Sequence, residues 1–397
     1  MTIDWFCLNA EGIGCDLSLE EIDTRSEVGI CYRLIMITFL IFIAVLGVLV
    51  LVHEWGHFVM ARRAGMRVDE FGFGFPPRLF GIKRGETMYS INWIPFGGFV
   101  KILGEDGDSR DDPRSFGSKP ISARLKVVVA GVVMNFLFAV FLLIMGNIFG
   151  LRIGLFDEEM IAVARDKKVQ IIQVISGSPA EKAGLKVLDE IAGFKVNGNI
   201  FTMTTIEEVQ KFTGEHRGEK VGLVLKQGKE LVTKEIETRA NPPSGEGSMG
   251  IAMALTGVVS YPWYEAVWRG GYDAYLLTYN TIYGYGLLFK TLFTDGKLIA
   301  EVSGPIGIAG ITGQAARVGF SYLMQFVALI SVNLAVLNIV PFPALDGGRA
   351  LFLFIEKFKG SPMDRKIESA LNGIGFALLL TLMIYVTIKD ITKFFSV

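Results

Sequence analysis

The chain has 397 residues, of which 51% are apolar and 20% are charged, and its formal net charge is −1. A soluble protein of this length would carry more charge on its surface, and a net charge near zero gives no reason to expect nucleic-acid binding. The three cysteines, Cys7, Cys15 and Cys31, all lie at the start of the chain. A disulfide framework for the main body is therefore excluded.

Residues 1–33 form an acidic leader without the basic start and apolar core of a signal peptide. Three interpretations stay open: a native segment outside the cytoplasm, an added segment, or a start upstream of a true first residue at Met36. No function is inferred from this leader.

Four uncharged stretches follow, and each can cross a hydrocarbon core of about 30 Å, which needs about 20 helical residues. They are residues 34–52, 127–151, 319–340 and 371–388. The sequence therefore predicts a polytopic α-helical membrane protein with four transmembrane helices. The first two spans and the loop between them make up residues 34–152, and the last two lie within residues 301–397.

Basic residues near the span ends predict the orientation, because cytoplasmic loops are enriched in lysine and arginine. They occur between spans one and two and between spans three and four: Arg62, Arg63, Arg67, Arg110, Arg114, Lys119, Arg124, Lys126, Arg349, Lys357, Lys359, Arg365 and Lys366. Both loops should be cytoplasmic, which places the long middle connection and both termini outside.

Residues 153–256 are polar and contain short alternating runs at 169–175 and 221–226, with helix candidates at 178–184 and 205–213. This pattern predicts a soluble α+β domain. The stretch 176–185 resembles a PDZ domain of the bacterial-protease type, whose peptide-binding strand would begin at Met249, Gly250 and Ile251. PDZ domains bind a peptide as an added strand, and the alternative is a PDZ-like fold that binds none.

Residues 257–300 contain tyrosines at helical spacing, Tyr272, Tyr275, Tyr279 and Tyr283, together with scattered charges. The charges argue against a full span, so the pattern favours an amphipathic helix at the membrane interface. A helix packed on the transmembrane bundle is an equal alternative.

The run HEWGH, residues 53–57, continues the first span. On a helix, His53 and His57 share a face and can direct two imidazoles at one metal ion. Glu54 lies beside them, where a general base of a zinc hydrolase would be. The motif also occurs by chance in unrelated proteins, but ionisable groups near membrane depth are costly and are usually functional.

A catalytic zinc needs a third protein ligand. His216 lies in the polar domain, so the candidate must be a carboxylate, and Asp346 is the first acid after the third span. Pro341 and Pro343 prevent a continuous helix there, and the freed backbone must line a wet cavity or be buried in protein. A simple helix cap at the membrane surface is the alternative for Asp346, and the nearby HEWGH motif favours the ligand.

HEWGH at the first span and the run NIVPFPALDG, residues 338–347, resemble the site-2 protease family of intramembrane zinc metalloproteases. The match is closest to the bacterial regulator-of-sigma-E proteases and covers roughly residues 36–397. The resemblance implies one catalytic Zn²⁺ held by His53, His57 and Asp346, with Glu54 as catalytic base. It also implies that Asn338 holds the substrate backbone or the developing oxyanion, and that Asn135 helps to hold an extended substrate. Family members often carry Gly-Pro before that second asparagine, and this chain does not.

Residues 69–101 alternate and are rich in glycine and aromatic residues, which predicts strands or a hairpin. By resemblance this is a membrane-associated β region near the active site. We hypothesise that one edge, with Gly97, Gly98, Phe99 and Val100, pairs with the unwound substrate. A purely structural cytoplasmic loop is the alternative.

The expected function is therefore an intramembrane zinc metalloendopeptidase of a bacterial inner membrane, with its active site opening toward the cytoplasm. By resemblance, its partners would be single-span membrane proteins such as anti-sigma factors or remnant signal peptides, whose tails the PDZ-like domain would select. Two other classes compete: a catalytically silent scaffold and a metal transporter. An intact Glu54 and the absence of an inverted repeat of the motif argue against them.

Overall fold

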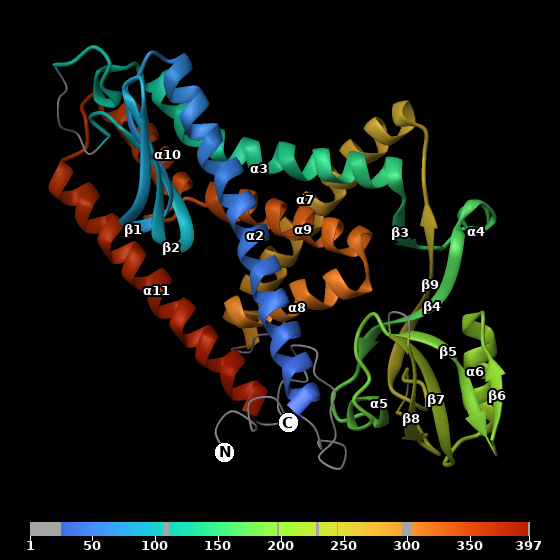
Figure 1. The fold of residues 1–397 in the computed structure, drawn as a ribbon. Coiled ribbons are helices and arrows are strands. Elements are labelled where there is room, and N and C mark those ends of the chain that lie inside the picture. The colour runs from blue at the N-terminus through green and yellow to red at the C-terminus, as the bar shows by residue number, and fades with distance from the viewer. Residues whose placement is uncertain are drawn as a thin grey trace. The chain divides into compact units, whose positions relative to one another are not determined.

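The structure is a computed structural model that describes residues 25–105, 111–196, 198–227, 230–243, 245–295 and 303–395. Among these, the chain forms two compact units (Figure 1). The first contains the described residues up to Ile144, Trp268–Ala316 and the chain from Leu323 onward. The second contains Met145–Val267 and Arg317–Tyr322. Most of the predicted leader, residues 1–24, lies outside the described residues.

Long helices make up most of the first unit. They are α2 (Arg25–Arg63), α3 (Ile121–Phe149), α7 (Trp263–Asp295), α8 (Pro305–Val318), α9 (Phe320–Ile339), α10 (Asp346–Lys359) and α11 (Arg365–Phe395). Four helical stretches are long and apolar enough to span a membrane: Arg33–Arg63, Ile121–Phe149, Phe320–Ile339 and Arg365–Thr392. The four predicted spans are confirmed by length and composition.

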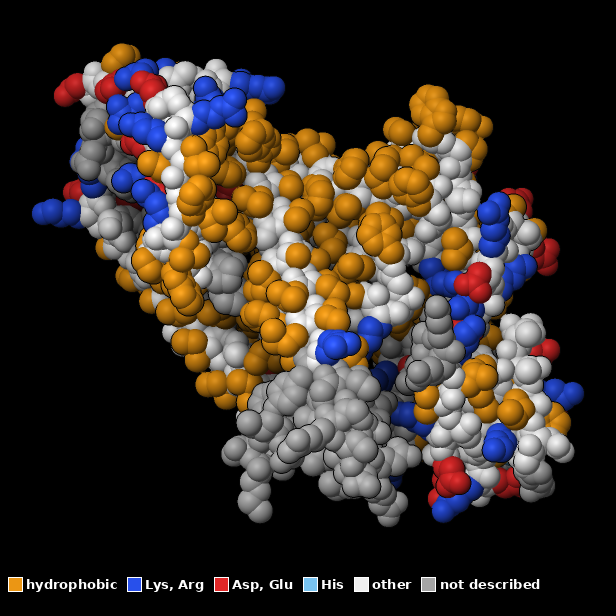
Figure 2. Space-filling model, in the orientation of Figure 1, with side chains coloured by type: hydrophobic (Ala, Val, Ile, Leu, Met, Phe, Trp, Pro, Cys, Tyr) orange, Lys and Arg blue, Asp and Glu red, His pale blue; other side chains and the backbone are white. Residues whose placement is uncertain are grey.

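The spanning helices expose much of their apolar surface. Only 11–39% of the most apolar window of each is buried, and Figure 2 shows hydrophobic side chains spread over the visible face of this unit. On α11, Ile374, Phe376 and Leu378 are each more than half exposed. Contiguous apolar surface of this extent is not left in water, so lipid is the solvent that the helices are built for.

The aromatic stretch forms one helix, α7, which is not among the four spanning candidates. Tyr272, Tyr275, Tyr279 and Tyr283 are each more than half exposed. Tyr285, by contrast, donates a hydrogen bond to Asn333 of α9, with 2.7 Å between the oxygens. The helix therefore packs on the bundle along one side, and its place at the membrane interface stays a prediction.

The predicted β region consists of two long bent strands, β1 (Val68–Arg84) and β2 (Thr87–Ile102). Residues 70–73 of β1 pair on one side with residues 98–101 of β2 and on the other with residues 88–91. The two strands thus act as four segments in the order 98–102, 68–73, 88–92 and 78–84. The two outer pairings are antiparallel, whereas residues 70–73 and 88–91 run in the same direction. Gly74 and Gly97 have positive φ angles of 79° and 92° at the bends, a conformation that glycine adopts without strain.

The second unit is built on a seven-stranded sheet in the order β3-β9-β4-β5-β7-β8, with β6 paired to β5. Its strands are β3 (Leu151–Gly154), β4 (Arg165–Val174), β5 (Glu190–Val196), β6 (Asn199–Thr202), β7 (Lys220–Gln227), β8 (Glu230–Glu237) and β9 (Ile251–Val259). Three helices accompany it: α4 (Glu158–Val163), α5 (Pro179–Lys182) and α6 (Ile206–Glu215). The predicted strands at 169–175 and 221–226 and both predicted helices are confirmed.

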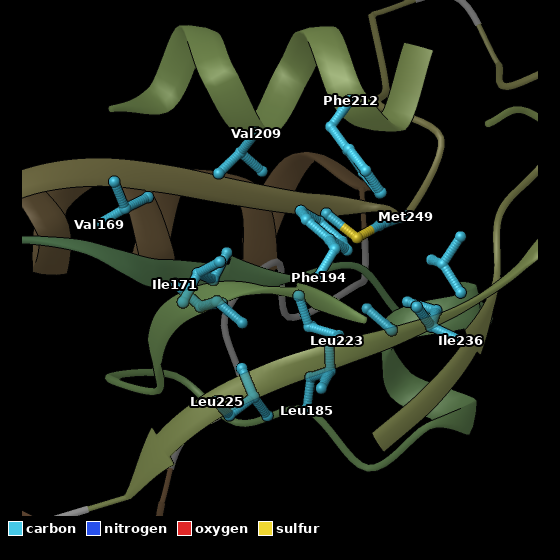
Figure 3. Close-up of a cluster of buried hydrophobic side chains, with 13 residues drawn as sticks. Val169, Ile171, Leu185, Phe194, Val209, Phe212, Leu223, Leu225, Ile236 and Met249 are labelled. Atoms are coloured by element: carbon cyan, nitrogen blue, oxygen red, sulfur yellow. The ribbon is translucent and has the colours of Figure 1, made fainter. Parts of the chain in front are cut away.

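Local sequence explains where α6 begins. The Thr205 side chain accepts from the Glu208 backbone N–H at 3.2 Å, and the Glu208 carboxylate accepts from the Thr205 N–H. This reciprocal capping satisfies two N–H groups that have no partner within the helix. The apolar face of α6 then covers a core that includes Phe194, Ile171 and Leu223, all 0% exposed (Figure 3).

Phe194 is the largest fully buried side chain, and its ring stacks on Phe212 with centroids 4.3 Å apart. Phe194→Ala should lower the free energy of unfolding of the second unit by about 3–5 kcal/mol, because a buried aromatic leaves a large cavity. Limited proteolysis of the full chain, with mass spectrometry of the fragments, measures this change. Leu231→Ala, at an exposed position of β8, is the control and should shift stability by no more than about 0.5 kcal/mol. Equal protease sensitivity of the two variants would contradict the assigned core.

Candidate active site

Two histidines of α2 meet because the HEWGH motif is helical. His53 and His57 are four residues apart and so share one face, and their Nε2 atoms are 3.2 Å apart. His57 Nδ1 lies 2.8 Å from the backbone oxygen of Val127 on α3. A carbonyl can only accept, so this nitrogen carries the proton and leaves the Nε2 lone pair free for a metal.

Asp346 reaches the same point from the far end of the chain. The third span ends at Ile339, and Asp346 is the first residue of α10. Between them the chain turns tightly: a Cβ on Gly347 would lie 2.2 Å from the Val340 oxygen, and one on Gly348 would lie 2.3 Å from the Phe342 oxygen. The glycines permit this turn, which places Asp346 Oδ2 3.1 Å from His53 Nε2 and 3.2 Å from His57 Nε2.

The three side chains fit a zinc ion. Ligand atoms around a tetrahedral zinc, with bonds of about 2.0–2.1 Å, lie about 3.3 Å apart, close to the separations of 3.1–3.2 Å found here. Asp346 Oδ2 is buried and has no hydrogen-bond partner, which leaves it available as a ligand. Two imidazoles and one carboxylate are also the donor set of several catalytic zinc sites. No other cluster of this kind is found among the described residues.

Gly131 of α3 leaves the space that an ion would need. A Cβ placed on Gly131 would lie 2.4 Å from His57 Nε2 and 2.8 Å from His53 Nε2. Both distances are too short for a carbon–nitrogen contact, so a methyl group here would clash with the metal-facing sides of both imidazoles. No local pattern indicates this role, because a single glycine within an apolar helix is tolerated for many reasons.

Glu54 does not join the ligand cluster but lines the same cavity. That cavity has a volume of about 410 Å³. Its lining consists of His53, Glu54, His57, Phe75, Gly98, Phe99, Val100, Glu105, Phe116, Val127, Val128, Ala344, Leu345, Asp346, Arg349 and Asn372. The predicted base, the ligand cluster and three of the predicted β-edge residues thus share one space.

The other predicted site residues lie elsewhere. Gly97 is at the bend of β2 and Asn338 is half-buried near the end of α9, and neither lines the cavity. Asn135 is 1% exposed and contacts His53 rather than the cavity. Met249, Gly250 and Ile251 belong to the second unit, where Met249 is part of the core.

Sequence reasoning missed an ion pair at the cavity wall. Arg349, one turn after Asp346 on α10, donates to the carboxylate of Glu105, which follows β2. Asn372 of α11 accepts a hydrogen bond from the backbone N–H of Ala344 at 3.1 Å. These contacts join segments far apart in the chain, so no local pattern could indicate them.

Comparison with known proteins gives the same class. The sequence profile of peptidase family M50 matches residues 41–382. A candidate zinc metalloprotease of Clostridium perfringens is 37% identical over 345 residues, covering 86% of this chain and 95% of the relative. The zinc metalloprotease RasP of Shouchella clausii is 31% identical, covering 91% of this chain and 100% of the relative. The regulator of sigma-W protease RasP of Bacillus subtilis is 28% identical, covering 90% and 99%.

Fold, ligand cluster and relatives together define a membrane-embedded zinc metalloprotease. The chain belongs to peptidase family M50, the site-2 proteases. The cofactor of that family is Zn²⁺, as the names of the relatives state.

Gly131→Ala tests the metal position without removing a ligand. The added methyl group should reduce the zinc content of the purified protein to near zero, because it would clash with both Nε2 atoms and push the imidazoles out of position. Metal analysis of the purified chain measures this. Val133→Ala, at an exposed position of the same helix, should keep full occupancy. Normal zinc content in Gly131→Ala would show that the ion binds elsewhere.

Proposed function

We propose that the chain hydrolyses peptide bonds in or beside the transmembrane segment of single-span membrane proteins, as one cut in regulated intramembrane proteolysis. The observation that carries this proposal is the cluster of His53, His57 and Asp346, with Glu54 beside it. The cluster is built on a membrane-spanning helix and faces a cavity of about 410 Å³.

The proposed role of each residue follows from its position. His53, His57 and Asp346 hold the metal, which when bound supplies Lewis-acid polarisation of the scissile carbonyl and of the attacking water. Glu54 accepts a proton from that water and later donates it to the departing amine. Asn338 is assigned to the substrate backbone or the oxyanion by family resemblance alone.

Substrate presentation is assigned to the outer segment of the β region. Residues 98–102 of β2 pair with β1 on one side, and no other strand of the described residues pairs with them. Gly98 passes so close to Glu54 that a Cβ on it would lie 3.0 Å from Glu54 Cγ. An unwound substrate that adds to this edge would therefore pass beside the base, with its backbone extended and accessible.

Charge distribution supports the proposed orientation. Arg62 and Arg63 end α2 little more than one turn after the motif, and the loop before α3 is also basic. With basic loops in the cytoplasm, the cavity opens toward the cytoplasm of a bacterial inner membrane, and the second unit lies outside.

The second unit is proposed to be PDZ-like and to select substrate tails. Residues 251–254 of β9 pair with β4, whereas β3 pairs only with residues 256–259 and the Leu255 oxygen accepts from the Leu155 N–H at 2.8 Å. Among the described residues, the other edge of residues 251–254 is thus open to an added strand. The substrates proposed are anti-sigma factors or remnant signal peptides, in line with the sigma-W regulator named among the relatives.

Glu54→Gln is the first test of this function. Loss of the general base should reduce cleavage of a tagged single-span substrate by at least about 100-fold. Zinc content should stay normal, because Glu54 is not a ligand. Cleavage is read by gel mobility, with both proteins at matched zinc content. Equal cleavage by the two would favour a scaffold or a metal transporter instead.

Proline substitutions test the β edge. Phe99→Pro and Val100→Pro remove backbone N–H groups that point to opposite edges of the strand. One of these two N–H groups points to the open edge. The variant that removes it should abolish cleavage while zinc stays bound, because one hydrogen bond to the substrate and the local strand geometry are lost. Phe80→Pro, on the opposite outer segment 78–84, should still cleave. Normal cleavage by both Phe99→Pro and Val100→Pro would rule out pairing at this edge.

A further inference from the structure

The side chain of Asn135 is a deeply buried polar group next to the metal ligands that the proposed chemistry does not use. It projects from α3, is 1% exposed, and its Nδ2 lies 3.3 Å from His53 Nδ1. Its Oδ1 is buried without a hydrogen-bond partner. An amide paired with a metal-binding imidazole is placed to control that imidazole rather than to touch a peptide in the cavity.

Metal binding restricts what His53 can do. Its Nε2 faces Asp346 and His57, so this is the atom that binds the ion, and it must present a lone pair. A neutral imidazole then carries its proton on Nδ1, which needs an acceptor. The Asn135 amide is the hydrogen-bond partner of that nitrogen in the described structure, and of its two polar atoms only Oδ1 can accept.

A half-turn of the Asn135 amide exchanges Oδ1 and Nδ2 and leaves the rest of the chain in place. Because Oδ1 has no donor where it now lies, turning it toward His53 breaks no hydrogen bond made by that oxygen. If Nδ2 of Asn135 donates to His53 Nδ1, the imidazole proton must sit on Nε2, where the metal binds. If Oδ1 faces His53 instead, the proton sits on Nδ1 and Nε2 stays free.

We propose that Asn135 is a positioning residue whose side-chain oxygen accepts the Nδ1–H of His53 and so presents the Nε2 lone pair to the metal. This rests on the proposed metal site and differs from the substrate contact that resemblance implies for Asn135. His57 is held in the same tautomer by the backbone oxygen of Val127. Of the two Nδ1 hydrogen bonds, only the one to His53 can therefore be removed by substituting a side chain.

Variants of Asn135 separate the hydrogen bond from packing. Asn135→Leu keeps the approximate shape but removes the acceptor, and zinc affinity should fall about 10–100-fold, as is usual when the partner of a ligating histidine is lost. Asn135→Asp keeps an acceptor and should retain affinity far better than the leucine variant. Competition with a chromogenic chelator on the detergent-solubilised full chain measures the affinities.

Ser331→Ala is the control for packing between α3 and α9. Ser331 Oγ donates to the backbone oxygen of Asn135 at 2.7 Å, so its loss disturbs the same contact without touching the amide. Zinc affinity should change less than threefold. An Asn135→Leu variant with the same affinity as wild type would overturn the proposal, and so would a Ser331→Ala variant as weak as Asn135→Leu.

Spectroscopy tests the hydrogen bond in the unaltered chain, independently of whether any variant folds. The chain has three histidines, and His216 Nδ1, 2.9 Å from the Phe212 oxygen, gives an internal reference. With ¹⁵N-histidine in the zinc-loaded protein, the His53 Nδ1–H should resist exchange with water and be lost in Asn135→Leu, while the His57 signal stays. A rapidly exchanging His53 Nδ1–H in wild type would overturn the assignment. Loss of zinc from every protein, wild type included, would instead count against the proposed metal site.

Discussion

The structure depends on the cost of placing ionisable groups within a membrane helix. Two imidazoles and a carboxylate meet at one point, and a glutamate lies beside them on α2. Asp346 Oδ2 is buried without a hydrogen-bond partner. A bound cation compensates all three ligands at once, and unpaired groups at this depth would otherwise be expensive. The chain break after the third span, the glycines that follow it and the missing side chain at Gly131 all allow the three ligands to come together.

Much of this arrangement follows from local sequence. The four uncharged runs predict the spans, and the i, i+4 spacing of His53 and His57 predicts a shared face. Asp346 is the first acid after a span that prolines interrupt, which predicts a ligand there. The alternating runs predict the strands. Each of these signals depends on periodicity or on chain order, which a sequence displays directly.

The remaining features depend on where distant segments meet. The contacts of Gly131 with the histidines, of Asn135 with His53, and of Arg349 with Glu105 join residues 74–244 positions apart. None leaves a local periodic trace. The position of Asn135 illustrates the limit: the sequence placed an amide on the second span, but only packing shows that it contacts a ligand and not the cavity.

The two units place their apolar side chains differently. The sheet unit has an apolar core around Phe194 and capped short helices, as a water-soluble domain does. The helical unit exposes its apolar surface and concentrates its polarity inward. The chain thus combines a unit whose apolar side chains are buried with a unit whose apolar side chains face outward.

The placement of the ligands has a topological consequence. His57 and Asp346 are separated by about 290 residues, and the metal joins them as a disulfide would, by closing a very long loop. Between these two residues lie the β region, the second span, the whole sheet unit and the third span. Once bound, the ion therefore also links the first and last thirds of the chain.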